Sequence, residues 1–287
     1  MTQTADHQPI DSTQTYLRED VRGVFTGDDL LEVAFNLPGE PFRDVKGRRT
    51  LRVELDGRFF FIKLHYGVGW PEILKNWSQF KRPVVGAENE YIVCRALAEV
   101  GIRAPVVAAY ARSSQLAPYR RSFVLCDELS DHTNLEEVAA AWLKHPPSFQ
   151  QVRGLLTSVA LFARRYHQQG FIHRDFYLCH LLIHNRDLAD LDVQPVELGV
   201  LDLHRARRFK QIPDRWLKRD LAALLFSSMD LQLSERAWLR FVRLYTNRPL
   251  REEFAERGAF WREVKARAEK LYRDGLKRGI VQGKYPL

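Results

Sequence analysis

Two runs of strand-forming residues joined at Asp56-Gly57 are the feature that most limits what this chain can fold into. The runs are "TLRVELDG" and "RFFFIKLH", residues 50–57 and 58–65. An Asp-Gly pair between such runs is the strongest short-range signal for a β-hairpin, because both residues of its two-residue turn adopt a positive φ. The sequence therefore predicts an antiparallel hairpin, with Lys63 set in the apolar run of its second strand.

The segments after this hairpin predict more strands and one helix. "GAENEYIVCRALAEVG", residues 86–101, has acidic residues in its first turn and a glycine at its end, which is typical of a helix. "APVVAAYA", residues 104–111, and "SFVLCDEL", residues 122–129, are short apolar runs that predict strands. We expect the order strand, strand, helix, strand, strand.

After residue 129 the pattern becomes helical. "NLEEVAAAWLKH", residues 134–145, and "SFQQVRGLLTSVALFARRYHQQG", residues 148–170, carry helical periodicity behind capping residues, and the chain from about 213 onward reads as helices. We predict an α+β chain with a flexible polar tail at 1–18, a small β-rich N-terminal lobe at 19–128 and a larger, mainly helical C-terminal lobe at 129–287.

Composition narrows the class of protein. The chain has 287 residues and 44 Lys+Arg against 36 Asp+Glu, a formal charge of +8, which favours an anionic partner. No helix-turn-helix, zinc-finger or RNP signature accompanies that charge, so we expect no nucleic-acid partner.

The three cysteines are far apart and form no CxxC pair, and no apolar stretch is long enough to span a membrane or act as a signal peptide. A reduced cytoplasmic location fits the cysteines, and we expect a protein that is soluble or peripheral to a membrane.

The segment "FIHRDFYLCHLLIH", residues 171–184, places costly polar groups in an apolar run, which asks for a functional reason. Zinc binding by Cys179, His180 and His184 is disfavoured, because neighbouring side chains point in different directions and a zinc site needs convergent ligands. A cysteine nucleophile has no support beyond Cys179 itself. The remaining option treats His173-Arg174-Asp175 as one unit, with Asp175 as proton acceptor in phosphoryl transfer.

The order of charged residues along the chain supports that option. Lys63 lies on a predicted strand, an acidic residue follows in the next helix, Asp175 comes after a helical region, and Asp202 ends the apolar run "GVLD". This is the order of protein-kinase-like enzymes. A single lysine in a strand is often only an amphipathic surface residue, so the joint, ordered occurrence carries the interpretation. It specifies the fold further as a bilobal protein-kinase-like fold.

With these residues in place, the chain resembles the lipopolysaccharide core heptose kinases, the WaaP/RfaP group with the InaA-like proteins nearby. The resemblance runs from roughly residue 40 to 280. It is carried by the segments "GRRTLRVELDGRFFFIKLH", "PVVGAENEY", "HRDFYLCHLLIH", "LDLHRA", "RWLKRDLAALLFSSM" and "RPLREE".

The resemblance implies ATP- and Mg²⁺-dependent phosphorylation of a heptose hydroxyl in the inner core of lipopolysaccharide, at the cytoplasmic face of the inner membrane of a Gram-negative cell. By matching position, Lys63 would hold the α- and β-phosphates of ATP and pair with Glu90, with Glu88 as the alternative. Asp175 would accept the proton, and Asp202 would be the principal Mg²⁺ ligand.

Several further residues complete the candidate site. His173 and Arg174 flank the proton acceptor and are catalytic candidates with it. Asp127 and Glu128, which end the last predicted strand of the first lobe, are candidates for nucleotide binding. Asp220, in "DLAALLFSS", is expected to brace the backbone of the catalytic loop rather than to contact substrate.

The chain departs from the protein-kinase pattern in three places. The Gly-rich loop is absent, because the equivalent turn "VKGRRT" holds only Gly47, so Arg48 and Arg49 or nearby backbone would have to cover the phosphates. His180 stands five residues after Asp175, where protein kinases have Asn, and imidazole suits Mg²⁺ poorly, so a second metal ion at His180 is in doubt. Leu203-His204 replaces Phe-Gly, so we expect a site without an activation-loop switch.

Two basic segments are candidates for contact with a charged glycolipid or a membrane. "HRARRFK" at 204–210 follows the expected metal ligand, and "WSQFKRP" at 77–83 combines Trp77 and Phe80 with two cations. Ordinary solvated charge explains either one as well. The last amphipathic stretch, "LREEFAERGAFWREVKARAEKLYRDGLKRG" at 250–279, is more typical of a helix packed on its own domain than of a membrane anchor.

Two other functions remain open on these residues. The same fold could phosphorylate another acceptor, such as a protein or an aminoglycoside-like molecule. A non-catalytic pseudokinase that binds an anionic glycolipid would explain the missing Gly-rich loop and His180, but the retained Lys63, Asp175 and Asp202 argue against it.

Overall fold

The structure is a computed structural model that describes residues 15–26, 29–45, 47–67, 86–113, 119–283 and 285. The described chain divides into two compact units. The N-terminal unit runs to Ser130 and also takes in Asp202–Arg205, and the C-terminal unit consists of Asp131–Leu201 with the chain from Ala206 onward. The basic segment at 77–83 lies outside the described residues.

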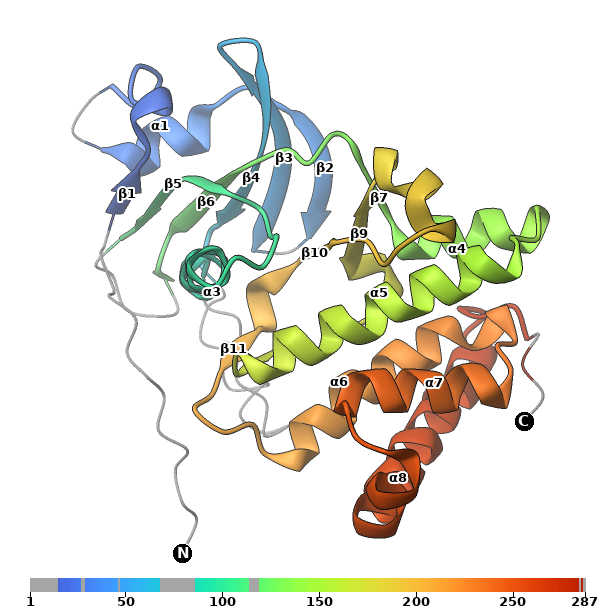
Figure 1. Cartoon of the computed structure of the whole chain (residues 1–287). Coiled ribbons are helices and arrows are strands. Elements are labelled where there is room, and N and C mark those ends of the chain that lie inside the picture. The colour runs from blue at the N-terminus through green and yellow to red at the C-terminus, as the bar shows by residue number, and fades with distance from the viewer. Residues whose placement is uncertain are drawn as a thin grey trace, which may run out of the picture. The chain divides into compact units, whose positions relative to one another are not determined.

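The N-terminal unit is built on a six-stranded antiparallel sheet, drawn from blue to green in Figure 1. Its strands, in the spatial order of the sheet, are β1 (Thr15–Leu17), β5 (Val107–Arg112), β6 (Ser122–Asp127), β4 (Arg58–His65), β3 (Arg48–Leu55) and β2 (Glu40–Val45). Each neighbouring pair is antiparallel. The sequence thus predicted the four central strands of this sheet.

The predicted hairpin is present and fixes which side chains face which way. Asp56 and Gly57 have φ values of 49° and 75°, the positive values that a two-residue hairpin turn needs. Because strand side chains alternate, Phe60, Ile62 and Leu64 enter the buried core, while Lys63 points to the opposite face of the sheet. The core is closed by α1 (Leu30–Asn36), whose first amides are capped by the Asp29 side chain.

Helix α3 (Glu88–Glu99) packs against β5 and β6 in the same unit and matches the predicted helix. Tyr91 on α3 stacks on Tyr110 of β5 with ring centroids 4.2 Å apart. The helix also contacts the short 3-10 turn η5 (Leu203–Arg205), which is why that distant piece of chain belongs to this unit. A second turn, η1 (Glu19–Val21), follows β1.

The C-terminal unit is mainly helical (Figure 1). Its helices are α4 (Leu135–Lys144), α5 (Phe149–Gln168), α6 (Asp214–Ser228), α7 (Glu235–Thr246) and α8 (Leu250–Lys277). Small strands and turns carry the chain between them: β7 (His132–Asn134), β8 (Phe171–Ile172), η3 (Leu178–His180), β9 (Leu181–His184), η4 (Asn185–Asp192), β10 (Leu198–Val200), β11 (Arg207–Arg208) and η6 (Met229–Leu231). Strands β9 and β10 form the hairpin-like pair that follows the candidate loop, and β11 pairs with β8.

The two longest helices form for reasons visible in the sequence. Helix α5 begins with a full capping box, in which Ser148 and Gln151 each accept a backbone amide of the other. Helix α8 buries Trp261, Val264 and Ala268 against its own unit and packs on α6 and α7, as its amphipathic pattern predicted. Among the described residues, no helix combines the length and the apolar character needed to cross a bilayer.

The predicted fold class, a β-rich N-terminal part and a helical C-terminal part, is confirmed. The predicted tail at 1–18 extends too far, because Thr15–Leu17 pairs with β5 as strand β1. Its first 14 residues lie outside the described chain. Strand β2 was not predicted, because every one of its residues is exposed and its sequence lacks an apolar alternation. Helix α1 was not predicted either.

Candidate functional site

Lys63 and Glu90 form an ion pair inside the N-terminal unit. The Lys63 Nζ lies 2.5 Å from the Glu90 Oε1 and 3.6 Å from the Asp202 Oδ1. Glu88, the alternative partner, pairs instead with Arg112 at 3.1 Å. The structure therefore selects Glu90 and brings three sequence-predicted residues, from β4, α3 and the 202–205 segment, to one point.

Electrostatics keep Lys63 charged at this point. Burial alone would lower its pKa, but the attraction of Glu90 and Asp202 and the hydrogen bond to Glu90 outweigh it and raise the pKa above the ordinary value for lysine. The Glu90 side chain is only 3% exposed, so it relies on Lys63 for its compensating charge. The pair presents a fixed ammonium group on the sheet face opposite the apolar core.

Strand register distinguishes the two predicted arginines. Arg48 lies directly opposite His65, on the same face of the sheet as Lys63. Arg49 has the opposite side-chain direction, lies opposite Asp44 on β2, and its Nε is 3.8 Å from that carboxylate. Arg48 is therefore the arginine that shares a face with Lys63.

His65 is a buried imidazole on this cationic face. Its burial, together with the positive charges of Arg48 and Lys63, lowers its pKa to about 3. At neutral pH it is therefore uncharged. The positive charges of Arg48 and Lys63 give this face a positive potential, which suits the phosphate chain of a nucleotide.

Asp202 is held in a strained and well-supported position. Its φ is 56°, a left-handed conformation that costs a non-glycine residue about 1–3 kcal/mol and recurs at functional sites. The His204 Nδ1 donates to its Oδ1 at 2.6 Å, and the Asn89 side chain donates to the backbone carbonyls of Leu203 and His204. These contacts fix the carboxylate beside Lys63.

Asp127 and Glu128 are engaged in ion pairs within the N-terminal unit. Asp127 pairs with Arg18 at 2.7 Å and with Arg58 at 3.2 Å, and Glu128 forms a two-bond pair with Arg52, both bonds being 2.8 Å. Their backbone amides donate to Val106 and Phe59. The structure thus uses both side chains to tie strands and the N-terminal segment together.

In the C-terminal unit, Asp220 on α6 holds the loop that follows β8. Its fully buried carboxylate accepts the backbone amides of His173 at 2.6 Å and Arg174 at 2.7 Å. Arg174 has a φ of 73°, so the two bonds stabilise a backbone conformation that is unfavourable by itself. The predicted bracing role of Asp220 is confirmed.

Asp175 follows directly and is oriented by a neighbour on α6. The Arg219 Nη2 lies 3.5 Å from the Asp175 Oδ1, and its Nε donates to the carbonyl of Arg174 at 2.8 Å. The guanidinium of Arg174 itself lies 5.1 Å from the centroid of Trp216. The Arg174 side chain thus turns to α6, and Asp175 is the carboxylate that the loop presents.

The two histidines of the loop, His173 and His180, hydrogen-bond backbone carbonyl groups. The His173 Nε2 donates to the carbonyl of Leu201 at 2.7 Å, and the His180 Nδ1 donates to the carbonyl of Asp175 at 2.7 Å. Their rings stack at 5.2 Å. The His173 imidazole therefore ties the loop to the backbone at Leu201, and the His180 imidazole holds the backbone of Asp175 itself.

The zinc alternative gains no geometric support. His184 meets the ring of His132 edge-on at 4.9 Å, and its Nδ1 accepts the Arg186 amide. No cluster of three or more His, Cys, Asp or Glu side chains that could hold a metal ion occurs in the part of the chain that the structure describes.

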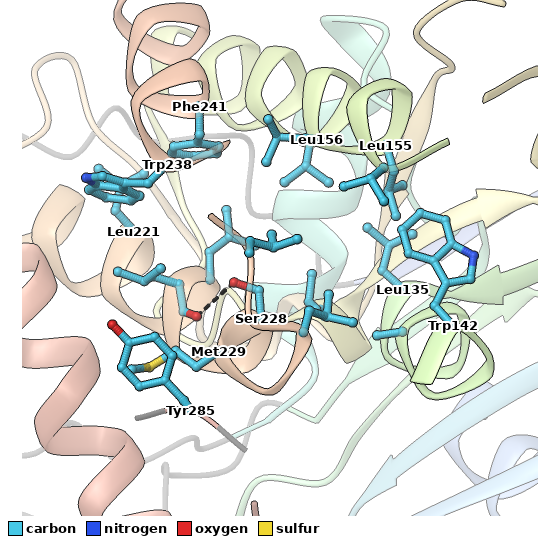
Figure 2. Close-up of a pocket in the computed structure, with 18 residues that line it drawn as sticks. Leu135, Trp142, Leu155, Leu156, Leu221, Ser228, Met229, Trp238, Phe241 and Tyr285 are labelled. Carbon is cyan, nitrogen blue, oxygen red and sulfur yellow. Dashed lines mark hydrogen bonds between the residues drawn. The ribbon is translucent and has the colours of Figure 1, made fainter. Parts of the chain in front are cut away.

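A separate apolar cavity of about 120 Å³ lies within the C-terminal unit (Figure 2). Side chains of α4, α5, α6, α7 and η6 line it, among them Leu135, Leu155, Leu156, Leu221, Trp238 and Phe241. Ser228, a polar group in the wall, donates to the backbone carbonyl of Leu225 within the same helix, so the lining is left apolar in character. Leu178, three residues after Asp175, also reaches this cavity.

The fold, a β-rich N-terminal part followed by a helical C-terminal part, is that of a protein-kinase-like phosphotransferase. Comparison with known sequences narrows this class: the profile of the Lipopolysaccharide kinase (Kdo/WaaP) family matches residues 34–245, and the chain belongs to that family. Two curated relatives are named lipopolysaccharide core heptose(I) kinase WaaP. The one from Pseudomonas aeruginosa is 39% identical over 89% of this chain and 95% of its own length, and the one from Escherichia coli K12 is 33% identical over 92% and 99%.

A solved structure, WaaP in complex with acyl carrier protein, is also similar to this chain. It superposes with a TM-score of 0.75 at 34% identity and covers 91% of this chain and 100% of that chain. The family resemblance inferred from the sequence motifs is thereby confirmed.

Two supporting residues were missed from the sequence. Asn89 immediately precedes Glu90 and holds the backbone after Asp202, and Arg219 immediately precedes Asp220 and contacts Asp175. Each adjoins a residue that the motifs did single out. Their polar side chains at these positions were the only available signal, and it does not specify a partner.

Proposed function

We propose that this protein is an ATP-dependent kinase that phosphorylates a heptose hydroxyl of the lipopolysaccharide inner core. The observation that carries the proposal is the match, over about nine-tenths of the chain, to relatives named heptose(I) kinases. Membership of a kinase family implies ATP as phosphate donor. The retention of Lys63, Glu90, Asp175 and Asp202, with the contacts described above, favours catalysis over a pseudokinase role.

In the proposed mechanism the heptose hydroxyl oxygen bonds to the γ-phosphorus of ATP, and the bond from that phosphorus to the ADP oxygen breaks. Asp175 accepts the hydroxyl proton, while Arg219 and the backbone bonds to Asp220 keep its carboxylate in place. Lys63, fixed by Glu90, would hold the α- and β-phosphates, and Arg48 on the same sheet face would add positive charge.

The residues present fit one Mg²⁺ ion. Magnesium prefers carboxylate oxygens, and Asp202 offers a carboxylate whose position is fixed by His204 and Lys63. When bound, the ion would neutralise charge on the transferring phosphoryl group. His180 is a weaker candidate, because its Nδ1 is committed to the Asp175 carbonyl and imidazole suits Mg²⁺ poorly.

The test is phosphate transfer from ATP to purified, dephosphorylated lipopolysaccharide core, with the product mapped by mass spectrometry. Replacement of Asp175 by Asn should lower turnover about 100- to 10,000-fold, the usual contribution of a positioned acid or base. Asp190→Asn, which alters an exposed carboxylate of the same unit, is the matched control. Equal turnover in the two variants would remove Asp175 from the mechanism, and transfer to proteins or aminoglycosides but not to core would change the acceptor.

We further propose the place of reaction. Because the donor is ATP, the reaction belongs on the cytoplasmic side, and a lipid-linked core acceptor would bring the enzyme to the inner membrane surface. Flotation with liposomes that carry the core glycolipid should move the protein with the vesicles, whereas plain phosphatidylcholine liposomes should not.

An acyl carrier protein is the proposed protein partner of this chain. The solved relative is in complex with such a protein, and carrier proteins bear a fatty acyl chain on a flexible arm. The apolar cavity of the C-terminal unit (Figure 2) offers a lining suited to methylene groups. We therefore assign this cavity to the acyl chain.

Binding to acylated and unacylated carrier protein tests this partner. Leu156→Phe, which fills part of the cavity, should weaken binding of the acylated form and leave any binding of the unacylated form unchanged. Leu161→Phe, at a partly exposed position of the same helix, is the control. Equal affinity of both variants for the acylated form would remove the cavity from the interaction.

A further inference from the structure

A second pocket of the C-terminal unit has a strongly cationic lining and no role in the function proposed above. It encloses about 370 Å³ between the end of α5, the chain at 210–212, the end of α7 and the start of α8. Four cationic side chains line it, Arg164, Lys210, Arg248 and Arg257, against one carboxylate, Glu253. The excess of positive charge calls for an explanation.

Internal ion pairs account for only part of that charge. Arg257 pairs with Asp214 at 2.7 Å, and Arg248 pairs with Glu256 at 2.8 Å and with Glu253 at 3.3 Å. Glu253 is nearly fully buried and also accepts the Trp261 Nε1 at 2.8 Å, so its capacity to neutralise another cation is already used. The remaining cations of the lining are Arg164 and Lys210.

Of these two cations, Arg164 gives the stronger indication of a bound ligand. Its Nε is buried and has no hydrogen-bond partner in the structure. A buried donor without an acceptor costs about 1–3 kcal/mol, so such a group in a pocket wall points to a ligand that accepts from it. Lys210 also lines the pocket and is exposed, so its flexible side chain can turn toward an anion.

The rest of the lining supplies further hydrogen-bonding groups. Gln168, Gln211 and Thr246 line the pocket, and the wall includes His167, whose Nδ1 lies 2.8 Å from the Tyr245 hydroxyl. The His167 Nε2 lies 3.5 Å from the Asp220 carboxylate, the group that braces the catalytic loop. The pocket thus combines guanidinium forks, an ammonium group and amide donors, the set that recognises phosphate oxygens.

We propose that this pocket binds a phosphate group, either as free inorganic phosphate or as the monoester of a phosphorylated sugar. A phosphate dianion can accept from Arg164 and Lys210 at once and offset the uncompensated charge of the lining. The proposal does not depend on the kinase assignment, because binding is measured without ATP and without acceptor.

The test is isothermal titration calorimetry of the full chain with inorganic phosphate, and separately with glucose 6-phosphate, in a phosphate-free buffer of low ionic strength. Arg164→Gln and Lys210→Gln should each weaken binding about 10-fold, as expected for loss of one charged hydrogen bond. Arg243→Gln, an exposed cation of α7 outside the lining, should leave affinity unchanged. Lys210 is exposed, so its variant keeps the test valid if Arg164→Gln folds poorly.

The nucleotide side of the protein is a competing location for phosphate. Saturating ADP, which would occupy that location, should therefore leave the measured affinity for phosphate unchanged, whereas loss of phosphate binding in the presence of ADP would overturn the proposal. So would equal affinity in all pocket variants, equal binding of acetate, or no binding to the native chain. Tighter binding of glucose 6-phosphate than of inorganic phosphate supports a phosphorylated sugar as the ligand, and equal affinity supports free phosphate.

Discussion

The carboxylate of Asp220 accepts the backbone amide of His173 at 2.6 Å, and a second bond from Arg174 uses its other oxygen. A charged acceptor inside helix α6 thus sets the backbone of a loop 46 and 47 residues away along the chain. The positive φ of Arg174 persists because these two bonds compensate for it.

Replacing Asp220 by Asn should lower turnover and leave the KM for ATP unchanged. The Asn side chain keeps the shape, but its NH2 group would face an amide donor, so one bond is lost and the other loses its charge. We expect the free energy of unfolding to fall by about 1–3 kcal/mol. Steady-state kinetics with urea denaturation would measure both effects. Unchanged turnover, compared with the exposed control Asp190→Asn, would contradict a role in positioning Asp175.

The Lys63–Glu90 pair predicts a non-additive mutant cycle. Lys63→Met should destabilise the protein by about 3–5 kcal/mol, because Glu90 would remain buried without a partner. Adding Glu90→Gln should restore part of that loss. Glu88→Gln should cost less than about 1 kcal/mol, since its pair with Arg112 is partly exposed. Strict additivity of the first two substitutions in urea unfolding would show that they do not interact.

Alanine substitutions at two glycines with positive φ, Gly57 and Gly170, would distinguish the cost of a steric clash from the cost of a left-handed backbone. A Cβ at Gly170 would lie 2.1 Å from the carbonyl oxygen of Phe209, whereas one at Gly57 meets nothing within 4 Å. Their φ values, 84° and 75°, are similar. Gly57→Ala should therefore cost about 1–2 kcal/mol, the penalty of a left-handed alanine, and Gly170→Ala clearly more. Melting temperatures of the two variants would compare them, and an equal decrease would contradict the steric argument.

His65 predicts a specific loss of stability in acid. Its pKa falls from 6.5 in the unfolded chain to about 3 in the folded one, so the unfolded state binds the proton more readily. The contribution of His65 is complete above pH 6.5 and is lost toward pH 3, by about 1.4 kcal/mol per pH unit. His65→Gln should flatten the pH dependence of urea unfolding between pH 6 and 4, while the exposed control His145→Gln should not. Parallel profiles for native protein and His65→Gln would contradict this pKa.

The sequence predicted those elements whose conformation depends on local signals such as turn residues and helix caps. Asp56-Gly57 specified its turn, Ser148 specified the start of α5, and the Lys63 side chain could be assigned to a face once its strand was recognised. Strand β2 gave no such signal, because an exposed edge strand is held by pairing with β3 rather than by burial of its own side chains.

The sequence motifs predicted individual residues of the candidate site but not the partners that those residues contact. Glu88 and Glu90 lie two residues apart on α3, so their side chains point in different directions. Which of the two faces Lys63 cannot be read from the sequence. The ion pairs of Asp127 and Glu128 depend on arginines 109 and 76 residues away, at Arg18 and Arg52. Contacts over such separations follow from strand register, and a single sequence gives no register between distant strands.

The assignment of Asp202–Arg205 to the N-terminal unit has a consequence for protein engineering. Because the backbone passes from one unit to the other after Ser130, Leu201 and Arg205, no single cut yields two complete fragments. A fragment that stops at Ser130 would lack the carboxylate that Lys63 faces and the turn on which α3 packs. Split versions of this kinase, or chimaeras that exchange its halves at residue 130, should therefore be designed with a grafted 202–205 turn.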